Sequence, residues 1–267
     1  MTDYLLYFRA AQNAALKAAE VLHHWREKFQ VKEKGRFDLV TEADLASQQA
    51  IVAVLSSSFP DHAFLGEEEG ASKTRPAPDA PPTWIIDPID GTTNYVHDCP
   101  FYCISIGLQV QGELVVGAIY DPSRKEMFAA GKGIGAWLND HRIKVSTIPN
   151  LTKALMATGF PADLRGNEKS LDWWKHFSYQ TQALRRTGST ALNMAYVAAG
   201  RFDAYYAFDN NVWDIAAGVV LVREAGGSVT NIDGSHYDPY TPDALATNGH
   251  LHHEMAATFR AGLPATT

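Results

Sequence analysis

The fold of this chain is decided by the stretch Trp84-Ile85-Ile86-Asp87-Pro88-Ile89-Asp90-Gly91-Thr92-Thr93-Asn94. Residues 84–86 form a short apolar run bounded by breakers, which predicts the end of a buried strand. Pro88 has no backbone N–H, so we expect the strand to end there. Asp87 and Asp90 then stand together at its carboxyl end, where two like charges repel unless a cation lies between them. Oxygen-rich clusters of this kind suit hard cations such as Mg²⁺.

Length, composition and charge narrow the class of protein. The 267 residues are 46% hydrophobic and 20% charged, which is typical of a folded, soluble chain. A net charge of -7 argues against a nucleic-acid partner. The sequence contains no apolar run of membrane length and no signal-peptide pattern at its start, so we expect a cytoplasmic protein without membrane contact. Cys99 and Cys103 fit neither a disulfide framework nor a zinc ribbon and are expected as buried free thiols.

The first half of the chain predicts two helices and then a meander of strands. Apolar spacing predicts a helix over residues 4–29, and the charged residues 32–36 are expected to form a turn. A second helix is expected to begin after Thr41, with Asp44 in a capping box, and to run to residue 59. A surface loop or a hairpin tip is expected over residues 71–82. Strands over 101–110 and 113–120 predict a β-hairpin, and a third strand is expected over 126–131.

Strands and helices alternate in the second half. Strands are expected over 155–158, 184–186 and 203–207, and helices over 168–183, 190–199 and 212–225. Such a pattern indicates sheets layered with helices. No boundary between domains is visible, so we expect a single domain over residues 1–267.

Three further acids stand where elements begin or end. Glu67 follows the apolar residues 63–65, Asp214 opens a predicted helix, and Asp44 lies in the first turn of another. Each has a structural explanation. Glu67 could belong to a solvated turn, Asp214 could match the helix dipole, and Asp44 could be only a capping-box acid.

Several blocks of the sequence together resemble the inositol monophosphatase family. They occur in the family's order between about residues 35 and 230, at 38–44, 66–68, 84–94, 188–206, 213–218 and 224–227. The resemblance implies an α+β fold, the layered α-β-α-β-α sandwich of the inositol monophosphatase and fructose bisphosphatase type. It also implies a homodimer that acts on a small sugar or polyol phosphate.

The resemblance implies a set of metal ligands. Glu67, Asp87 and the backbone carbonyl of Ile89 would hold a first Mg²⁺, and Asp87 would bridge to a second ion held by Asp90 and Asp214. A third, weaker ion near Glu67 would complete the set. Two such ions, about 3.5–4 Å apart, clamp the attacking and leaving oxygens of a displacement.

The resemblance also implies a reaction. Gly91 and Thr92 would offer backbone N–H groups to the phosphate. Asp44 would bond to Thr92, and this pair with Glu67 would orient and deprotonate a water. The implied activity is Mg²⁺-dependent, lithium-sensitive hydrolysis of a phosphate monoester, inositol 1-phosphate first, by a metal-activated water.

Substrate choice is less narrowly implied. Members specific for inositol carry a glutamate where this chain has Ala207, and Asp209 could take over its role. Arg185, Gly188, Ser189 and Thr190 match the substrate side of the family's site, and Asp214 is implied there too. Ser189 could simply be a helix N-cap. Lys32 or Lys34 could be a mobile lysine that faces the metals, or part of a solvated turn.

Two alternatives stay open. Related sites hydrolyse histidinol phosphate, adenosine 3′,5′-bisphosphate or fructose 1,6-bisphosphate. Some bacterial relatives have a binding role associated with transcription.

Overall fold

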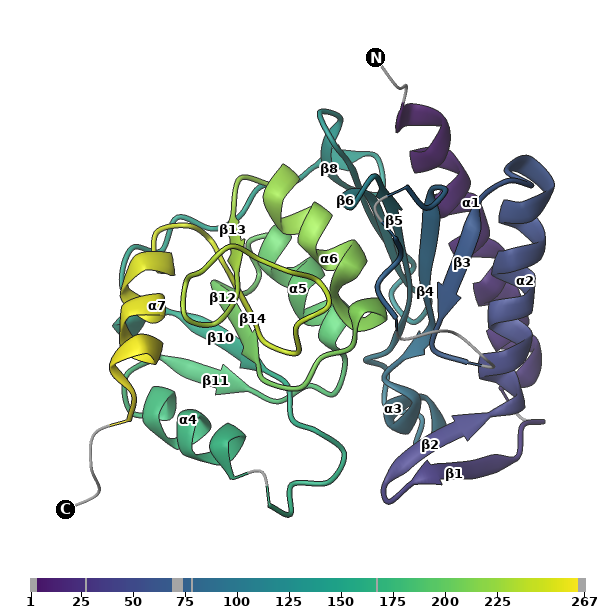
Figure 1. Ribbon diagram of the computed structural model, residues 1–267. Helices are drawn as coiled ribbons and strands as arrows, with labels where there is room; N and C mark the ends of the chain where they lie inside the picture. The colour runs from purple at the N-terminus through teal and green to yellow at the C-terminus, as the bar shows by residue number, and fades with distance from the viewer. Residues whose placement is uncertain (1–3, 27, 69–73, 78, 167, 264–267) are drawn as a thin grey trace.

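Two β-sheets alternate with layers of helices across the molecule (Figure 1). The computed structural model describes residues 4–26, 28–68, 74–77, 79–166 and 168–263. One sheet is covered on its outer face by α1 and α2, the other by α4 and α7, and α5 and α6 lie between the sheets. The expected α-β-α-β-α order is confirmed. The helices are α1 Tyr4–Trp25, α2 Glu42–Ser58, α3 Thr92–Val96, the short 3₁₀ turn Leu151–Lys153, α4 Lys169–Ser178, α5 Thr190–Ala198, α6 Val212–Glu224 and α7 His252–Ala261.

The larger sheet has the strand order β3-β4-β5-β6-β7-β8-β9. Strand β3 runs parallel to β4, and every other neighbouring pair in this sheet is antiparallel. The predicted hairpin is confirmed as β5 and β6, joined at Gln111 and Gly112, which both have positive φ. The strands are β3 Ala63–Gly66, β4 Thr83–Asp90, β5 Cys103–Val110, β6 Glu113–Asp121, β7 Glu126–Gly131, β8 Gly135–Leu138 and β9 His141–Arg142.

The smaller sheet has the order β11-β10-β12-β14-β13. Strand β10 is parallel to both of its neighbours, whereas β14 is antiparallel to β12 and β13. A separate hairpin of β1 and β2 lies beside α3 at the edge of the molecule (Figure 1). The strands are β10 Leu155–Thr158, β11 Ala183–Arg185, β12 Ala204–Ala207, β13 Ser228–Thr230, β14 Ala244–Thr247, β1 Val31–Gly35 and β2 Asp38–Thr41.

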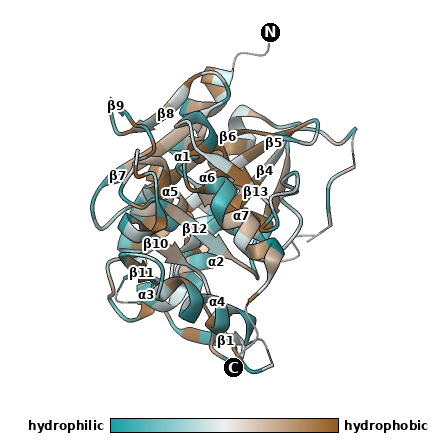
Figure 2. Cartoon of the chain, turned by 90° about the vertical axis from the view of Figure 1, so that its left-hand side faces the viewer, coloured by the Kyte–Doolittle hydropathy of each residue, from teal (hydrophilic) through white to brown (hydrophobic). Residues whose placement is uncertain are grey.

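Helix α6 packs against the larger sheet with almost no space between the two backbones. A Cβ atom added at Gly117 of β6 would lie 2.3 Å from the carbonyl oxygen of Ala217, and one added at Gly107 of β5 would lie 2.8 Å from the Cβ of Ala216. The buried core between the sheets includes Ile119, on the same face of the larger sheet. Figure 2 shows brown, apolar segments in the inner strands and teal, polar segments in many peripheral loops. The small residues on the sheet and on the helix therefore set the short distance between α6 and the larger sheet.

Strand β4 does not end at Pro88, as the sequence predicted. It continues to Asp90 across an irregularity, because Asp87 pairs with Ser105 and Asp90 pairs with Cys103. The strand thus carries one residue more than its partner, which is a β-bulge. A bulge accommodates proline because the missing N–H is not needed in the ladder there.

Other expectations need correction at their edges. Residues 32–36 lie in the β1–β2 hairpin and not in a simple turn. The helix expected over 168–183 ends at Ser178, and residue 183 already belongs to β11. The first helix ends at Trp25, four residues before the predicted limit. Cys103 is a buried free thiol as expected, but Cys99 is exposed.

Candidate active site

The five predicted acids arrive at one region from four separate elements. Glu67 follows β3 directly, and Asp87 and Asp90 come from the bulged end of β4. Because β3 and β4 are parallel neighbours, their carboxyl ends share one edge of the sheet. Asp44 lies in the first turn of α2, and Asp214 in the first turn of α6. Helix starts favour carboxylates, so each position is locally stable for an acid.

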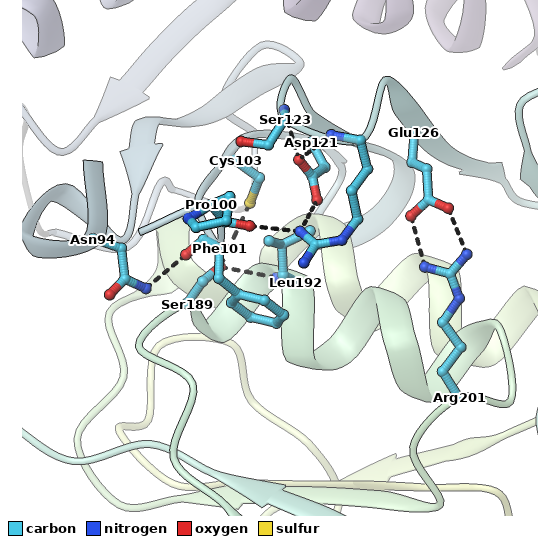
Figure 3. Close-up of polar contacts among 11 residues, drawn as sticks. Asn94, Pro100, Phe101, Cys103, Asp121, Ser123, Glu126, Ser189, Leu192 and Arg201 are labelled. Carbon is cyan, nitrogen blue, oxygen red and sulfur yellow. Dashed lines mark hydrogen bonds and ion pairs between the residues drawn. The ribbon is translucent and has the colours of Figure 1, made fainter. Parts of the chain in front are cut away.

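The carboxylate of Asp90 is held by the start of α5, which lies about a hundred residues further along the chain. Its Oδ2 accepts hydrogen bonds from Ser189 Oγ and from the Ala191 backbone N–H, both at 2.6 Å, and its Oδ1 accepts from the Thr190 N–H at 3.2 Å. The buried Cys103 thiol lies 3.7 Å from the same Oδ2. The Cys103 Sγ also lies 3.7 Å from Ser189 Oγ, and Figure 3 draws both side chains. Asp90 therefore ties the larger sheet to the middle helix layer.

Asp44 belongs to the predicted capping box and also reaches Thr92. Its Oδ2 accepts hydrogen bonds from the Thr41 N–H and hydroxyl, both at 2.7 Å. Thr92 Oγ1 lies 3.3 Å from Asp44 Oδ1 and 3.0 Å from the carbonyl oxygen of Ile89. The one hydroxyl proton of Thr92 is thus shared between two acceptors. The lone pairs of Thr92 Oγ1 remain available to a hydrogen-bond donor.

Asp214 and Asp87 also bond to the backbone near them. Asp214 Oδ2 accepts from the Asn211 N–H at 2.6 Å, which makes a capping box for α6. Asp87 Oδ1 accepts from the Ile89 N–H at 3.0 Å across the bulge. The local turns therefore fix the direction of each carboxylate.

Burial and mutual repulsion favour the protonated form of these acids. Burial raises the pKa of Asp87 well above its ordinary value, and the negative charges of Glu67, Asp90, Asp214 and Asp44 raise it further. The pKa values of Asp90 and Asp214 are also raised, mainly by burial, although their hydrogen bonds oppose the shift. Burial raises the pKa of Asp44 to about 7. The neighbouring charges that act on Asp87 are all negative, so a cation among these acids would relieve the repulsion.

The donor set fits a hard divalent cation. Every side chain in the cluster offers carboxylate oxygen, the ligand that Mg²⁺ prefers over nitrogen or sulfur. Asp87 is only 2% exposed and Asp90 8% exposed, so their charges are shielded from bulk water. Over the described part of the chain, no group of three or more His, Cys, Asp or Glu side chains is arranged to hold a metal ion as it stands.

Two adjoining cavities open beside the acids. The first, of about 370 Å³, is lined by Glu67, Asp90 and Asp214 among others. The second, of about 280 Å³, is lined by the turn 91–94, and both cavities share Gly188 in their walls. Glu67, Asp90, Asp214 and the turn after β4 thus line a hollow made of two adjoining cavities, which is large enough for a small phosphorylated molecule.

The substrate side of this hollow differs in part from the expectation. Ser189 is 2% exposed and caps α5, since its Oγ accepts from the Leu192 N–H at 3.2 Å. Ala207 is buried in β12, whereas Asp209 is exposed and lines the first cavity. Arg186 lines both cavities, although the sequence had pointed to its neighbour Arg185. No local pattern separates two adjacent arginines, so only the strand's position could select one.

Of the two lysines that the sequence offered as candidates to face the metals, only Lys32 has a described side chain. Lys32 is exposed on β1. The pKa of the nearby Glu42 carboxyl is lowered, mainly by two backbone hydrogen bonds and to a smaller extent by the positive charge of Lys32. The side chain of Lys34 lies outside the described residues. Asp38, which follows the hairpin turn and which the sequence had not singled out as a site residue, lines both cavities instead.

Known proteins match the chain over almost its whole length. The model of the inositol monophosphatase family matches residues 5–263. An inositol-1-monophosphatase from Synechocystis is 42% identical over 97% of this chain and 91% of its own length. A Nus factor SuhB from Pseudomonas aeruginosa is 39% identical over 95% and 96%. The solved inositol monophosphatase from Anabaena superposes with a TM-score of 0.88 at 37% identity, with 99% of both chains covered.

The fold, the acidic cluster and the matches to known proteins together define the class of enzyme. The protein is a metal-dependent phosphoric monoester hydrolase of the layered α-β-α-β-α fold. More particularly, the chain belongs to the inositol monophosphatase family.

Proposed function

We propose that the chain hydrolyses the phosphate monoester of a small polyol, with inositol 1-phosphate as the first candidate and inositol and phosphate as products. The observation that carries the proposal is the meeting of Glu67, Asp90 and Asp214 at one cavity that adjoins the turn 91–94. Acidic ligands and a backbone turn for an anion are the two parts that such a hydrolase needs.

We propose that Glu67, Asp87, Asp90, Asp214 and the carbonyl of Ile89 hold two Mg²⁺ ions, with a third, weaker ion near Glu67. Ions bound in this way would lower the pKa of water and stabilise negative charge on the attacking and leaving oxygens. The raised pKa of Asp87, caused first by burial and then by four acidic neighbours, supports a cation in this place.

The chain's own residues prepare the attacking water. Thr92 Oγ1 directs its proton toward Asp44 and the Ile89 carbonyl, and accepts a hydrogen bond from the water through its lone pairs. Because Asp44 Oδ1 is an acceptor for the Thr92 hydroxyl, this carboxyl can take up the proton that the water passes to Thr92. Glu67 lines the same cavity and helps to orient the water. The backbone N–H groups of Gly91 and Thr92 hold the phosphate.

The substrate side supports a broad rather than a strict preference for inositol. Ala207 cannot accept a hydrogen bond from a substrate hydroxyl, and Asp209 stands at the cavity wall two residues later. Gly188 and Asp214 line the cavity and would face the leaving group, while Ser189 bonds to Asp90 and to its own helix. Loss of one hydrogen-bonding partner weakens discrimination between substrates. A panel with histidinol phosphate, adenosine 3′,5′-bisphosphate and fructose 1,6-bisphosphate measures that preference.

The direct test compares turnover of inositol 1-phosphate with Mg²⁺, after EDTA, and in Asp87→Asn. We expect loss with EDTA, recovery with added Mg²⁺, and a fall in Asp87→Asn of roughly 10²-fold or more, as when one group that stabilises transition-state charge is removed. Asp203→Asn is the matched control, because Asp203 is also a buried acid but bonds to Ser146 and Leu155 away from the cavity. Full turnover in Asp87→Asn would refute the metal assignment.

A second role is supported by the names of two relatives. Proteins called Nus factor SuhB, from Pseudomonas aeruginosa and Pasteurella multocida, are 39% and 40% identical to the chain. A binding role in transcription would survive in Asp87→Asn, whereas hydrolysis would not. Affinity capture of transcription proteins by this variant and by the wild type separates the two roles.

We also propose that the protein acts as a homodimer in the cytoplasm, without nucleic-acid contact of its own. None of the helices in the described ranges has the length and apolar character that crossing a bilayer requires. Light scattering after size exclusion measures the oligomeric state, and fractionation of cells measures the location.

A further inference from the structure

We propose that Arg124 is a positioning residue for the phosphate turn, acting through the backbone of Pro100 and Phe101. The inference rests on the proposed function, in which the turn around Gly91 holds the phosphate. Arg124 itself lines neither of the two cavities at the acids. It reaches the turn through a chain of hydrogen bonds that starts at the far end of β6.

The first link is a buried ion pair at the end of β6. The Asp121 side chain is fully buried, and its Oδ1 accepts the N–H groups of Ser123 and Arg124 at 2.8 and 3.0 Å. Its Oδ2 accepts from Arg124 Nη1 at 2.9 Å. Asp121 thus holds the guanidinium in one orientation. Figure 3 shows Asp121 and Ser123 in this arrangement above Pro100 and Phe101.

The second link joins the guanidinium to the segment that follows α3. The same Nη1 of Arg124 donates to the carbonyl oxygen of Pro100 at 2.6 Å. The guanidinium also lies over the Phe101 ring, 5.6 Å from its centre. Residues 99–102 belong to no helix or strand, so regular backbone pairing does not fix their path. Hydrogen bonds to a charged donor are stronger than neutral ones, and this one fixes the position of the segment.

The third link joins that segment to both walls of the cavity. Asn94 Nδ2 donates to the Phe101 carbonyl at 2.6 Å and to the Thr187 carbonyl at 2.9 Å. A Cβ added at Gly91 would lie 3.2 Å from the Phe101 oxygen and 3.0 Å from the Gly188 oxygen. Asn94 therefore joins the Phe101 carbonyl to residue 187, and Gly91 lies between the carbonyls of Phe101 and Gly188. A shift of the Phe101 carbonyl would move Asn94 and the phosphate turn, and through Asn94 the wall at residue 187.

A neighbouring arginine supplies a matched control. Arg201 pairs with Glu126 through both terminal nitrogens at 2.6 Å, and its guanidinium lies 4.7 Å from the ring centre of Tyr196. The Tyr196 ring in turn contacts that of Phe101 edge to face, at 5.5 Å. Side-chain exposure is similar, 34% for Arg201 and 39% for Arg124. Arg201 thus belongs to the same aromatic stack but binds a carboxylate in place of the Pro100 carbonyl.

The experiment measures kcat, KM and the inhibition constant of inorganic phosphate in wild type, R124M, R124K and R201M. In R124M we expect the inhibition constant of phosphate and the KM to rise roughly tenfold, because the turn loses its orientation. R124K should recover most of this loss, since a single nitrogen makes both contacts and an ammonium can replace it. R201M should stay within about twofold of wild type on both constants.

Equal phosphate inhibition in R124M and R201M would overturn the inference, because the ion pair would then serve stability alone. If R124M does not fold, the phosphate inhibition constant of D121N is compared with that of R201M instead. The D121N side chain keeps an oxygen for the N–H groups of Ser123 and Arg124 but loses the negative charge that holds the Arg124 guanidinium. A wild-type chain that neither hydrolyses the ester nor binds phosphate would overturn the proposed function, and this inference with it. If the wild type hydrolyses the ester and binds phosphate, the proposed function stands, and the comparison of R124M with R201M then decides the role of Arg124 alone.

Discussion

Replacing Gly117 by alanine tests how closely α6 must lie on the larger sheet. The added Cβ would stand 2.3 Å from the backbone oxygen of Ala217, whereas ordinary contacts begin at 3.4 Å. A backbone oxygen in the middle of a helix cannot rotate away. The sheet and the helix must therefore separate by about 1 Å, or the helix must slide along the strand.

The magnitude follows from that separation. A gap of 0.5–1 Å already loses about a quarter to a half of each dispersion contact across it, and overpacking of a close-packed core costs about 1–3 kcal/mol. We expect Gly117→Ala to lie at the upper end, about 3 kcal/mol, because the clash is with backbone. For a chain of this size that corresponds to a fall in melting temperature of roughly 6–12 °C.

Activity should fall as well, because α6 carries Asp214 in its first turn. A displacement of about 1 Å in a catalytic group lowers kcat by as much as roughly 10²-fold. Calorimetry and turnover are measured together, with Gly35→Ala as the control. The Cβ of that variant would lie 3.8 Å from its nearest neighbour, so it should change stability by less than about 0.5 kcal/mol. A Gly117→Ala protein that melts within 2 °C of wild type, on the scale of about 3 °C per kcal/mol, would refute this account of the packing.

Three further predictions concern pH, salt and unfolding. His252 lies between Thr247 and Thr230, with 3.0 Å from each hydroxyl to a ring nitrogen, and burial lowers its pKa. The unfolded chain then takes up the proton at this position more readily, so the contribution of His252 to stability should be lost as pH drops below about 6.5. In urea titrations, the difference in stability between wild type and His252→Gln should therefore change across this pH, whereas the difference for His253→Gln, at the exposed neighbouring position, should stay constant. Lithium chloride should inhibit turnover more than sodium chloride at equal concentration, and equal effects in a kinetic assay would contradict the second-ion proposal. Finally, because α5 and α6 lie between both sheets, residues 1–267 should unfold as one domain in a single calorimetric transition, and two resolved peaks would count against it.

Local sequence patterns predicted most helices and strands but did not decide how these elements pack against one another. The capping box of Thr41 and Asp44 and the hairpin turn at Gln111 follow from short-range chemistry, and both are confirmed. Pro88 was misread because its local preference is to end a strand, whereas the register against β5 turned the same residue into a bulge. Strands β13 and β14, of three and four residues, are too short to be recognised without their partners, and helix α7 was missed although its apolar residues recur at helical spacing.

Of the site, the sequence by itself determined which side chains carry oxygen and which helix or strand end each would occupy. Composition and spacing act within a few residues, and caps and turns are set at that range. Only the tertiary structure decided that Asp90 would bind the start of α5, that Arg186 rather than Arg185 would face the cavity, and that Arg124 would hold Pro100. These contacts join segments from 24 to about 100 residues apart, and they form only when burial of the apolar core brings the two sheets onto the middle helices.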